Sequence, residues 1–188
     1  MLHIAFNYPN EITSAPNLRC ICMEEKLMVE IKKMLKASNK RILLQYDTTF
    51  NLTGYYASVL NILHPFLVNA TTKKSPPIPI AVYFHELKSE KVHNHFWRWM
   101  QDEFPEFDEK CCMITDCEKA IRNSISSCFP NMPLFRCWNH LWSSTERWIR
   151  KNGGDDSTVG FYTESLRELF LQNTKDAYEK LLELKKKG

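Results

Sequence analysis

The spacing of apolar residues along the chain predicts a mixture of strands and amphipathic helices. Apolar residues recur at helical spacing over 24–37, where acidic residues come early and lysines late, as suits a helix dipole. Short apolar stretches then predict strands at 41–50, 55–68 and 80–87, with Pro65 excluding a regular ladder at its own position. The first 22 residues are polar and interrupted by proline, so we expect a loose lead-in there.

The second half of the chain alternates helices and strands. The pattern predicts a helix over 89–104, a strand at 110–115, a helix at 116–129, a strand at 134–137, a helix over about 139–151 and a last helix over about 157–187, broken near Asn173-Thr174. A meander of three strands followed by strand–helix units predicts an α/β fold with a mixed sheet. The two later strands should be parallel, because helical crossovers connect them.

Composition and charge narrow the class of protein without identifying it. The 188 residues are 44% hydrophobic, enough to bury a core, and a net charge of +3 does not single out a nucleic-acid binder. The longest apolar stretch, 55–70, is broken by polar residues and a proline, so we expect no membrane partner. Seven cysteines in no secreted-scaffold spacing, behind a poor signal peptide, indicate the nucleus or the cytosol.

Two aspartates follow apolar strand stretches, where open α/β sheets place their sites. Asp47 lies in the first strand of the meander, and Asp116 lies between a later strand and its helix. Two carboxylates brought together there would bind Mg²⁺ or Mn²⁺, and such ions support phosphoryl transfer. The local pattern alone favours a structural reading instead, with Asp116 as a helix N-cap and Asp47 as a strand-end residue.

The order of five motifs changes that balance. QYDTTFNLTGYYASVL, PIPIAVYFHELKS, HNHFWRWM, MITDCEKAIRNSISSCFP and FRCWNHLW, over about residues 40–150, resemble the transposase domain of Mutator-like elements. The resemblance implies a ribonuclease-H-like fold with a five-stranded mixed sheet flanked by helices. It also implies a DDE-type site whose first two acids are Asp47 and Asp116, with Mg²⁺ or Mn²⁺ as cofactor. DNA at transposon ends would be the partner, with a nuclear location and a homo-oligomeric assembly left open.

The third acid of that family has no match in this chain. In the family it follows an inserted block of helices, and the candidates downstream, Glu146, Glu164 and Glu168, stand in no matching context. We therefore divide the chain into a lead-in and helix (1–39), a ribonuclease-H-like core (40–152) and a helical segment resembling the start of the insertion (153–188). We expect an incomplete fragment whose ancestral reaction is metal-dependent DNA cleavage and strand transfer. The alternative is a domesticated, non-catalytic DNA- or protein-binding module, so enzymatic activity stays open.

Three further features carry weaker hypotheses. Cys137 and His140 match the family's Cys-x-x-His and could supply two zinc ligands, but a closed zinc site needs four, and the pattern favours a buried thiol without zinc. Arg147 and Arg150 lie in a locally basic stretch and are candidate DNA phosphate contacts. The tryptophans interleaved with them could stack on bases, although helical spacing favours a core position for Trp138 and Trp142.

Overall fold

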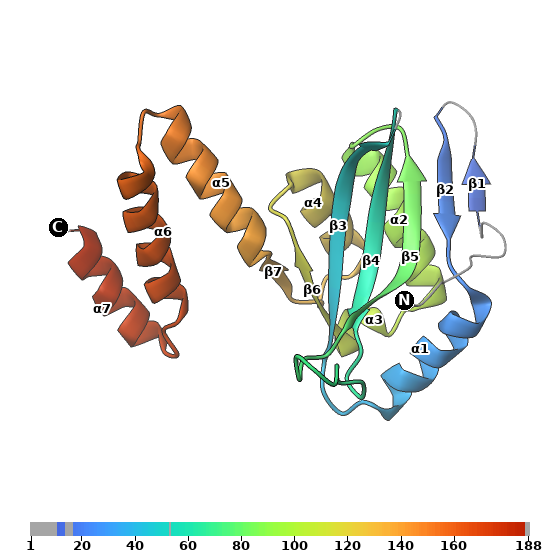
Figure 1. Cartoon of the computed structure of the whole chain (residues 1–188). Helices are drawn as coiled ribbons and strands as arrows, with labels where there is room; N and C mark the ends of the chain where they lie inside the picture. The colour runs from blue at the N-terminus through green and yellow to red at the C-terminus, as the bar shows by residue number, and fades with distance from the viewer. Residues whose placement is uncertain (1–10, 14–16, 53, 187–188) are drawn as a thin grey trace. The chain divides into compact units, whose positions relative to one another are not determined.

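The chain folds into two compact units. The computed structural model describes residues 11–13, 17–52 and 54–186 (Figure 1). The first unit extends to Cys137 and contains the sheet, and the second begins at Trp138 and is helical. Helix 138–151, which the sequence analysis grouped with the core, thus belongs to the second unit, and each unit is described by itself below.

The first unit is built on a single mixed sheet. Seven strands are present within the described ranges, in the spatial order β1-β2-β5-β4-β3-β6-β7 (Figure 1). They are β1 (Glu11–Thr13), β2 (Arg19–Cys22), β3 (Ile42–Leu52), β4 (Tyr55–Leu63), β5 (Pro77–His85), β6 (Cys111–Thr115) and β7 (Leu134–Arg136). The predicted meander is confirmed, since β3, β4 and β5 pair antiparallel in sequence order. The predicted parallel strands are confirmed too, since β6 pairs with β3 and β7 with β6 in parallel.

The expected strand count of five is wrong because the lead-in contributes two strands. β2 pairs antiparallel with β5, and β1 pairs with β2, so the segment that we expected to be loose extends the sheet at one edge. A short edge strand of this kind is stabilised by hydrogen bonds to the backbone N–H and C=O groups of the neighbouring strand. A four-residue strand leaves too short a pattern for sequence reasoning to detect.

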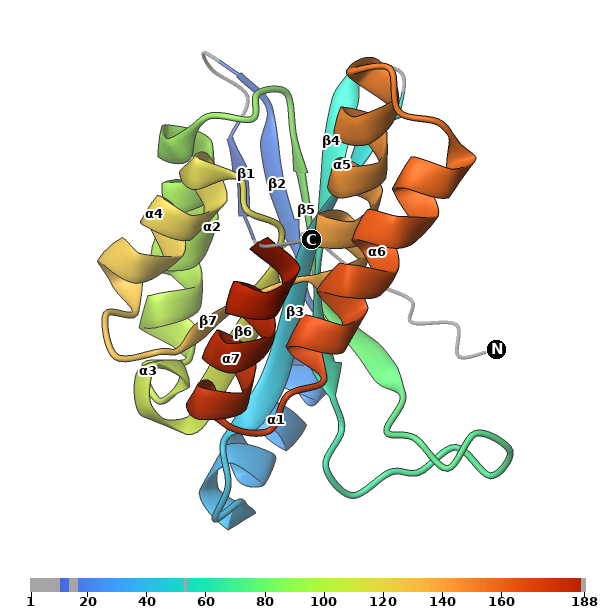
Figure 2. The same ribbon diagram turned by 90° about the vertical axis from the view of Figure 1, so that its left-hand side faces the viewer.

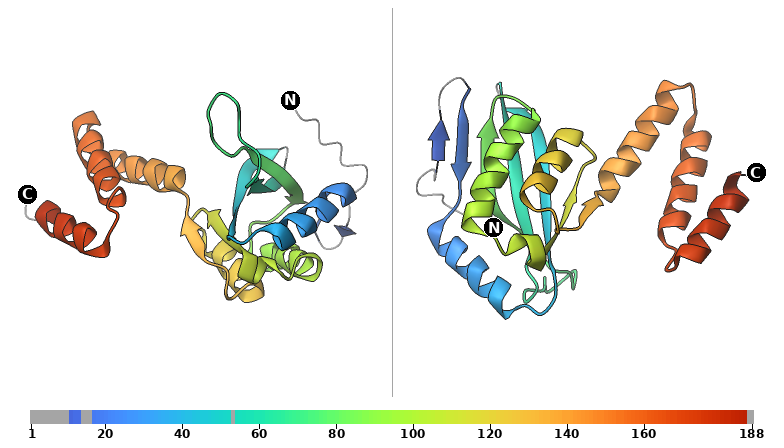
Figure 3. Two further views of the ribbon diagram at one scale, coloured as in Figure 1. Left: turned by 90° about the horizontal axis from the view of Figure 1, so that it is seen from below. Right: turned by 180° about the vertical axis from the view of Figure 1, so that it is seen from behind.

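Four helices complete the first unit. They are α1 (Glu25–Ala37), α2 (Glu90–Glu103), the short α3 (Phe107–Lys110) and α4 (Lys119–Cys128). Helices α2 and α4 lie side by side on one face of the sheet (Figures 2 and 3). Helix α4 begins three residues later than predicted, and α3 was not predicted.

Strand alternation decides which side chains enter the core. On β3, Ile42, Leu44 and Tyr46 are buried against the helices, whereas Asp47 between Tyr46 and Thr48 is exposed on the other face. Aromatic side chains of α2 and of the turns around α3 and α4 fill the layer between helices and sheet, and the fully buried ones are Phe96, Trp97, Phe104, Phe107 and Phe129.

The second unit consists of α5 (Trp138–Lys151), α6 (Asp156–Phe170) and α7 (Lys175–Lys186). The predicted break in the last helix is confirmed at residues 171–174. Few apolar side chains are buried in this unit, among them Ile149, Val159 and Leu169, while Phe161 and Phe170 are exposed. None of the helices that the structure describes combines the length and apolar character needed to cross a lipid bilayer.

Candidate active site

Asp47 and Asp116 follow paired residues of the neighbouring strands β3 and β6. Asp116 comes directly after the end of β6, whereas Asp47 lies within β3, which continues to Leu52, so the interpretation of Asp47 as a strand-end residue is wrong. Tyr46 of β3 pairs with Thr115 of β6 at the last register position of their parallel ladder, and the two aspartates are the next residues. Neighbouring strands lie about 4.8 Å apart, so about one strand spacing separates the two backbones at this point. The topology thus places the two aspartates predicted from the sequence on neighbouring strands, although their motifs lie far apart in the chain.

Asp116 also organises the turn between β6 and α4. The N-cap residue of α4 is Glu118, not Asp116. One carboxylate oxygen of Asp116 accepts a hydrogen bond from the backbone N–H of Glu118 at 3.1 Å, which stabilises the turn. The N-cap interpretation is therefore replaced by an Asx turn, and this turn holds the Asp116 carboxylate at the strand end.

Glu118 is a third carboxylate near this edge, and sequence reasoning missed it. Burial raises the pKa of the Glu118 carboxyl, the Lys88 ammonium opposes that rise, and the charge of Asp116 adds to it. Burial likewise raises the pKa of the Tyr46 hydroxyl, and the charges of Glu118 and Asp116 add to the rise. A carboxylate destabilised by a like charge is a feature of sites that bind cations or transfer protons. The signal in the sequence was its position two residues after Asp116.

Two arginines share a small cavity with Asp116. The cavity has a volume of about 180 Å³ and lies between β7 and the start of α4; it is lined by Asp116, Cys117, Arg122, Leu134, Phe135 and Arg136. Arg122 comes from α4 and Arg136 from the end of β7. Guanidinium groups present planar donors that match phosphate oxygens. The cavity therefore combines the Asp116 carboxylate with two guanidinium groups that can bind a phosphate. Neither arginine was predicted from the sequence.

A chain of buried hydrogen bonds begins at the residue that follows Asp47. Thr48 Oγ1 lies 2.7 Å from Ser58 Oγ, and Ser58 Oγ lies 2.8 Å from His85 Nε2. His85 Nδ1 lies 2.9 Å from the carbonyl oxygen of Leu87, which can only accept, so Nδ1 carries the proton. Nε2 then accepts from the Ser58 hydroxyl, which in turn accepts from Thr48. Since Ser58 and His85 are fully buried, this Ser–His pair positions the strands and is not exposed to a substrate.

The predicted zinc ligands are placed on either side of the boundary between the units. Cys137 ends the first unit, where its backbone N–H donates to the Thr115 carbonyl at 2.7 Å. His140 lies in the first turn of α5. Within the ranges that the structure describes, no three His, Cys, Asp or Glu side chains form a group that could hold a metal ion.

The two α5 arginines, Arg147 and Arg150, are both exposed. Arg150 is held by two carboxylates, with Nη2 3.0 Å from Glu146 Oε1 and Nη1 2.7 Å from Asp156 Oδ1. Arg147 Nε donates to the Ser143 carbonyl at 3.2 Å. Because its charge is already balanced, Arg150 has less to gain from a phosphate than Arg147 has.

The tryptophans of α5 pack against other aromatic rings to different degrees, and none of them is fully buried. The rings of Trp138 and Trp142 have centroids 5.7 Å apart, and Trp138 also meets Phe170 edge-on at 5.0 Å. The core position that helical spacing favoured is wrong for Trp138, which is exposed, and Trp142 is only half-buried. Trp148, in contrast, is 67% exposed, so it is the α5 tryptophan most open to a base or a partner.

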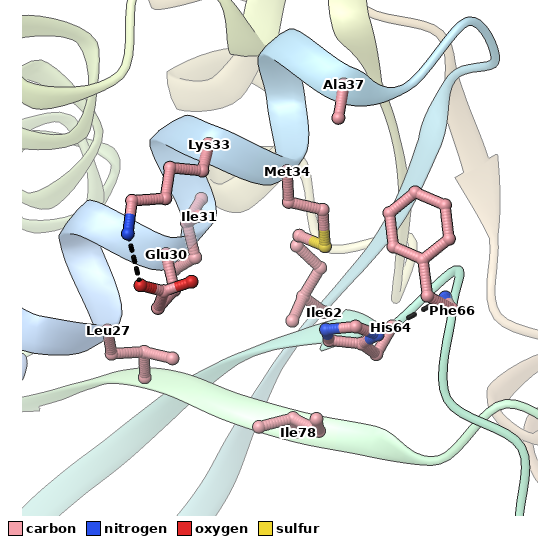
Figure 4. Close-up of a pocket in the computed structure, with 10 residues that line it drawn as sticks. All are labelled: Leu27, Glu30, Ile31, Lys33, Met34, Ala37, Ile62, His64, Phe66 and Ile78. Carbon is pink, nitrogen blue, oxygen red and sulfur yellow. Dashed lines mark hydrogen bonds and ion pairs between the residues drawn. The ribbon is translucent and has the colours of Figure 1, made fainter.

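A second hollow lies apart from the aspartates, between α1 and the ends of β4 and β5 (Figure 4). It has a volume of about 300 Å³, and aliphatic side chains such as Ile31, Met34 and Ile62 dominate its lining. His64 Nδ1 accepts the backbone N–H of Phe66 at 3.3 Å. The mainly aliphatic lining suits a small apolar group, and the hollow shares no lining residue with the cavity beside Asp116.

Comparison with known proteins does not assign the chain to a family. No protein-family model matches it, and no curated protein matches it.

Proposed function

We propose that the first unit is a ribonuclease-H-like domain derived from a Mutator-like transposase, which binds Mg²⁺ or Mn²⁺ at Asp47 and Asp116. The observation that carries the proposal is the register of β3 and β6, where the Tyr46–Thr115 pair directly precedes the two aspartates. The meander of β3, β4 and β5, extended by parallel β6 and β7, supports the five-stranded arrangement that the resemblance implies. In this proposal β1 and β2 are additions to that sheet.

The chemistry proposed for the site is metal-dependent attack on a phosphodiester of DNA, in the nucleus. Two carboxylates at one sheet edge are hard oxygen ligands of the kind that Mg²⁺ and Mn²⁺ prefer. A bound divalent ion would lower the pKa of a coordinated water and stabilise the developing charge on phosphate oxygens. Arg122 and Arg136, which line the cavity beside Asp116, would hold the phosphate.

The test is Mn²⁺ binding by calorimetry to the wild type and to the Asp47→Asn, Asp116→Asn double variant. We expect binding in the wild type and its loss in the double variant, with an exposed acid on α2 replaced in a control variant (Asp102→Asn) that binds normally. If no form binds Mn²⁺ while all are folded, the metal-dependent function is refuted. That result would favour the alternative function, a non-catalytic DNA- or protein-binding module.

DNA binding is tested separately from metal binding. The affinity for a DNA duplex is measured against salt for the wild type and for the Arg122→Gln, Arg136→Gln double variant. If both arginines contact phosphates, the slope of log affinity against log salt should become shallower by up to about 1.8, which is about 0.9 per phosphate contact. An unchanged slope would remove the two arginines from the DNA interface without bearing on the metal site.

A further inference from the structure

Two cysteines of β2 face each other on the side of the sheet that turns away from the core. Cys20 and Cys22 lie two residues apart on this strand, and alternate residues of a strand point to the same face. Ile21, between them, is fully buried in the core, so the two cysteines lie on the opposite face. There they stand across from Phe84 and Val82 of β5.

The two thiol groups converge more closely than the backbone requires. Along a strand, Cα atoms two residues apart are separated by about 6.7 Å. The Sγ atoms of Cys20 and Cys22, in contrast, lie 3.6 Å apart. Both side chains are half-buried, so solvent reaches them from one side. The pair therefore presents two soft sulfur atoms in one place.

The separation of the sulfur atoms is compatible with one coordination geometry. An ion with metal–sulfur bonds of about 2.3 Å and tetrahedral angles places two sulfur ligands about 3.8 Å apart. The same bonds in a linear arrangement would require about 4.6 Å. The observed 3.6 Å matches the tetrahedral value. This geometry is typical of zinc and of its heavier analogue cadmium.

We infer that Cys20 and Cys22 form a two-thiolate site for a thiophilic divalent cation of the zinc class. Two metal–sulfur bonds form as two S–H bonds break, and the two protons leave to solvent. The product carries no net charge, which suits a half-buried position. Among the residues that the structure describes, no third His, Cys, Asp or Glu completes a group with this pair. The remaining coordination positions are therefore taken by water or by a ligand from solution.

Protonation of the thiols gives the site a measurable signature. Burial raises the pKa of Cys22 to about 12, and the nearby Cys20 adds to the rise. Metal binding requires the thiolate form, so an ion held by two sulfur atoms displaces two protons at a pH below the ordinary thiol pKa of about 8.5. The apparent affinity should rise about 100-fold per pH unit for an ion held by two thiols, and about tenfold for an ion held by one.

The experiment titrates the full chain with Cd²⁺ under a phosphine reductant and follows the thiolate-to-cadmium absorption in the ultraviolet. We expect one ion per chain and the two-proton pH dependence. Cys20→Ser and Cys22→Ser should each lower the affinity by about 100-fold or more. The matched control is Cys112→Ser, which removes another half-buried thiol and should leave the binding unchanged.

Three results would overturn the inference: a one-proton pH dependence, wild-type affinity in either single variant, or a stoichiometry of one ion per two chains. The pH dependence is measured on the wild type, so it decides even if a serine variant does not fold. The site is independent of the proposed function. The Asp47→Asn, Asp116→Asn variant should bind Cd²⁺ as the wild type does, and Cys20→Ser should bind Mn²⁺ normally.

Discussion

Lowering the pH should destabilise the first unit through two buried histidines, His85 and His93. Neither side chain has any exposed surface. Burial is the main cause that lowers the pKa of His85 to about 4 and that of His93 to about 3, from an ordinary value of 6.5. The two rings meet edge-on with centroids 5.2 Å apart, so each would also repel a positive charge on the other.

Hydrogen bonding explains why the folded state keeps both rings neutral. His85 Nε2 accepts from the Ser58 hydroxyl, and a proton there would turn an acceptor into a donor. His93 Nδ1 lies 3.1 Å from the Tyr46 hydroxyl, while His93 Nε2 is buried and has no hydrogen-bond partner among the described residues. An imidazolium at either position would therefore bury a charge that the surroundings do not stabilise.

The sign and size of the effect follow from proton linkage. The unfolded chain binds protons near pH 6.5 and the folded chain does not until pH 4 or 3, so stability falls as the pH drops below 6.5. At about pH 5, each histidine should reduce the free energy of unfolding by about 2 kcal/mol relative to about pH 8, or about 4 kcal/mol together. That is a large part of the free energy of unfolding of a typical domain, which is about 5–15 kcal/mol.

The assay is urea unfolding at about pH 8 and about pH 5, followed by the fluorescence of the tryptophans. Trp97 is fully buried and packs against Phe96 and Tyr46, so its emission reports on the core that contains the histidines. The His85→Gln, His93→Gln double variant should lose most of the pH dependence, whatever its stability at the higher pH. The control His64→Gln, at a half-buried site in a turn, should keep it.

Equal wild-type stability at the two pH values, or a double variant with the full pH dependence, would refute the reasoning. A titration of the two imidazoles by NMR in the folded wild type provides a second measurement that needs no variant. If either ring titrates near pH 6.5 in the folded protein, its environment is not the one that the structure describes.

Three more predictions concern separate parts of the molecule. Gly154→Ala should destabilise the second unit by about 1–3 kcal/mol, because a Cβ at this position meets the side chain of Ile149. Gly160→Ala in α6 should instead stabilise the unit by about 0.5–1 kcal/mol, because the added Cβ meets no other atom. Thermal unfolding of the two variants measures both effects. Glu118→Gln should weaken Mn²⁺ binding about tenfold in calorimetry while raising the melting temperature, since it removes a half-buried charge beside another carboxylate. Replacing both Arg147 and Arg150 by glutamine should make the slope of log DNA affinity against log salt shallower. Arg150 should contribute less to this change than Arg147, because Glu146 already neutralises its charge. An unchanged slope would exclude both arginines from the DNA interface.

The elements that could be predicted from the sequence are those whose pattern is local. Helix α1 was predicted within one residue because its apolar residues recur at helical spacing over 13 residues. Strand β2 was missed because four residues carry almost no period, and its stability comes from pairing with β5 some 60 positions later in the chain. The late start of α4 has a different, local cause. The side chain of Asp116 accepts the N–H of Glu118, and this local bond competes with the helical turn that the apolar pattern extends backwards.

The candidate site divides in the same way. The placement of Asp47 and Asp116 on neighbouring strands could be predicted because the apolar pattern gave both strands and their order, although β3 continues past Asp47 and only β6 ends at its aspartate. Arg122 and Arg136 could not, because a cavity between the end of one strand and the side of a helix leaves no mark on either segment alone. Glu118 was within reach of sequence reasoning, but an acid at a helix start is ordinarily read as favourable to the helix dipole and nothing more.

The buried hydrogen-bonded chain from Thr48 to His85 holds together the strands on either side of β4. Three strands contribute one polar side chain each, and the bonds of 2.7 and 2.8 Å between them fix β3 against β4 and β4 against β5 directly beneath Asp47. Each partner is a residue that sequence reasoning would place on an apolar face as a misfit. Each is tolerated there because the other two satisfy its hydrogen bonds, and unpaired it would cost about 1–3 kcal/mol. Since a carboxylate must be held in place to bind a cation tightly, these bonds would help to fix the strand that carries Asp47, while the parallel pairing of β3 with β6 sets its register with Asp116.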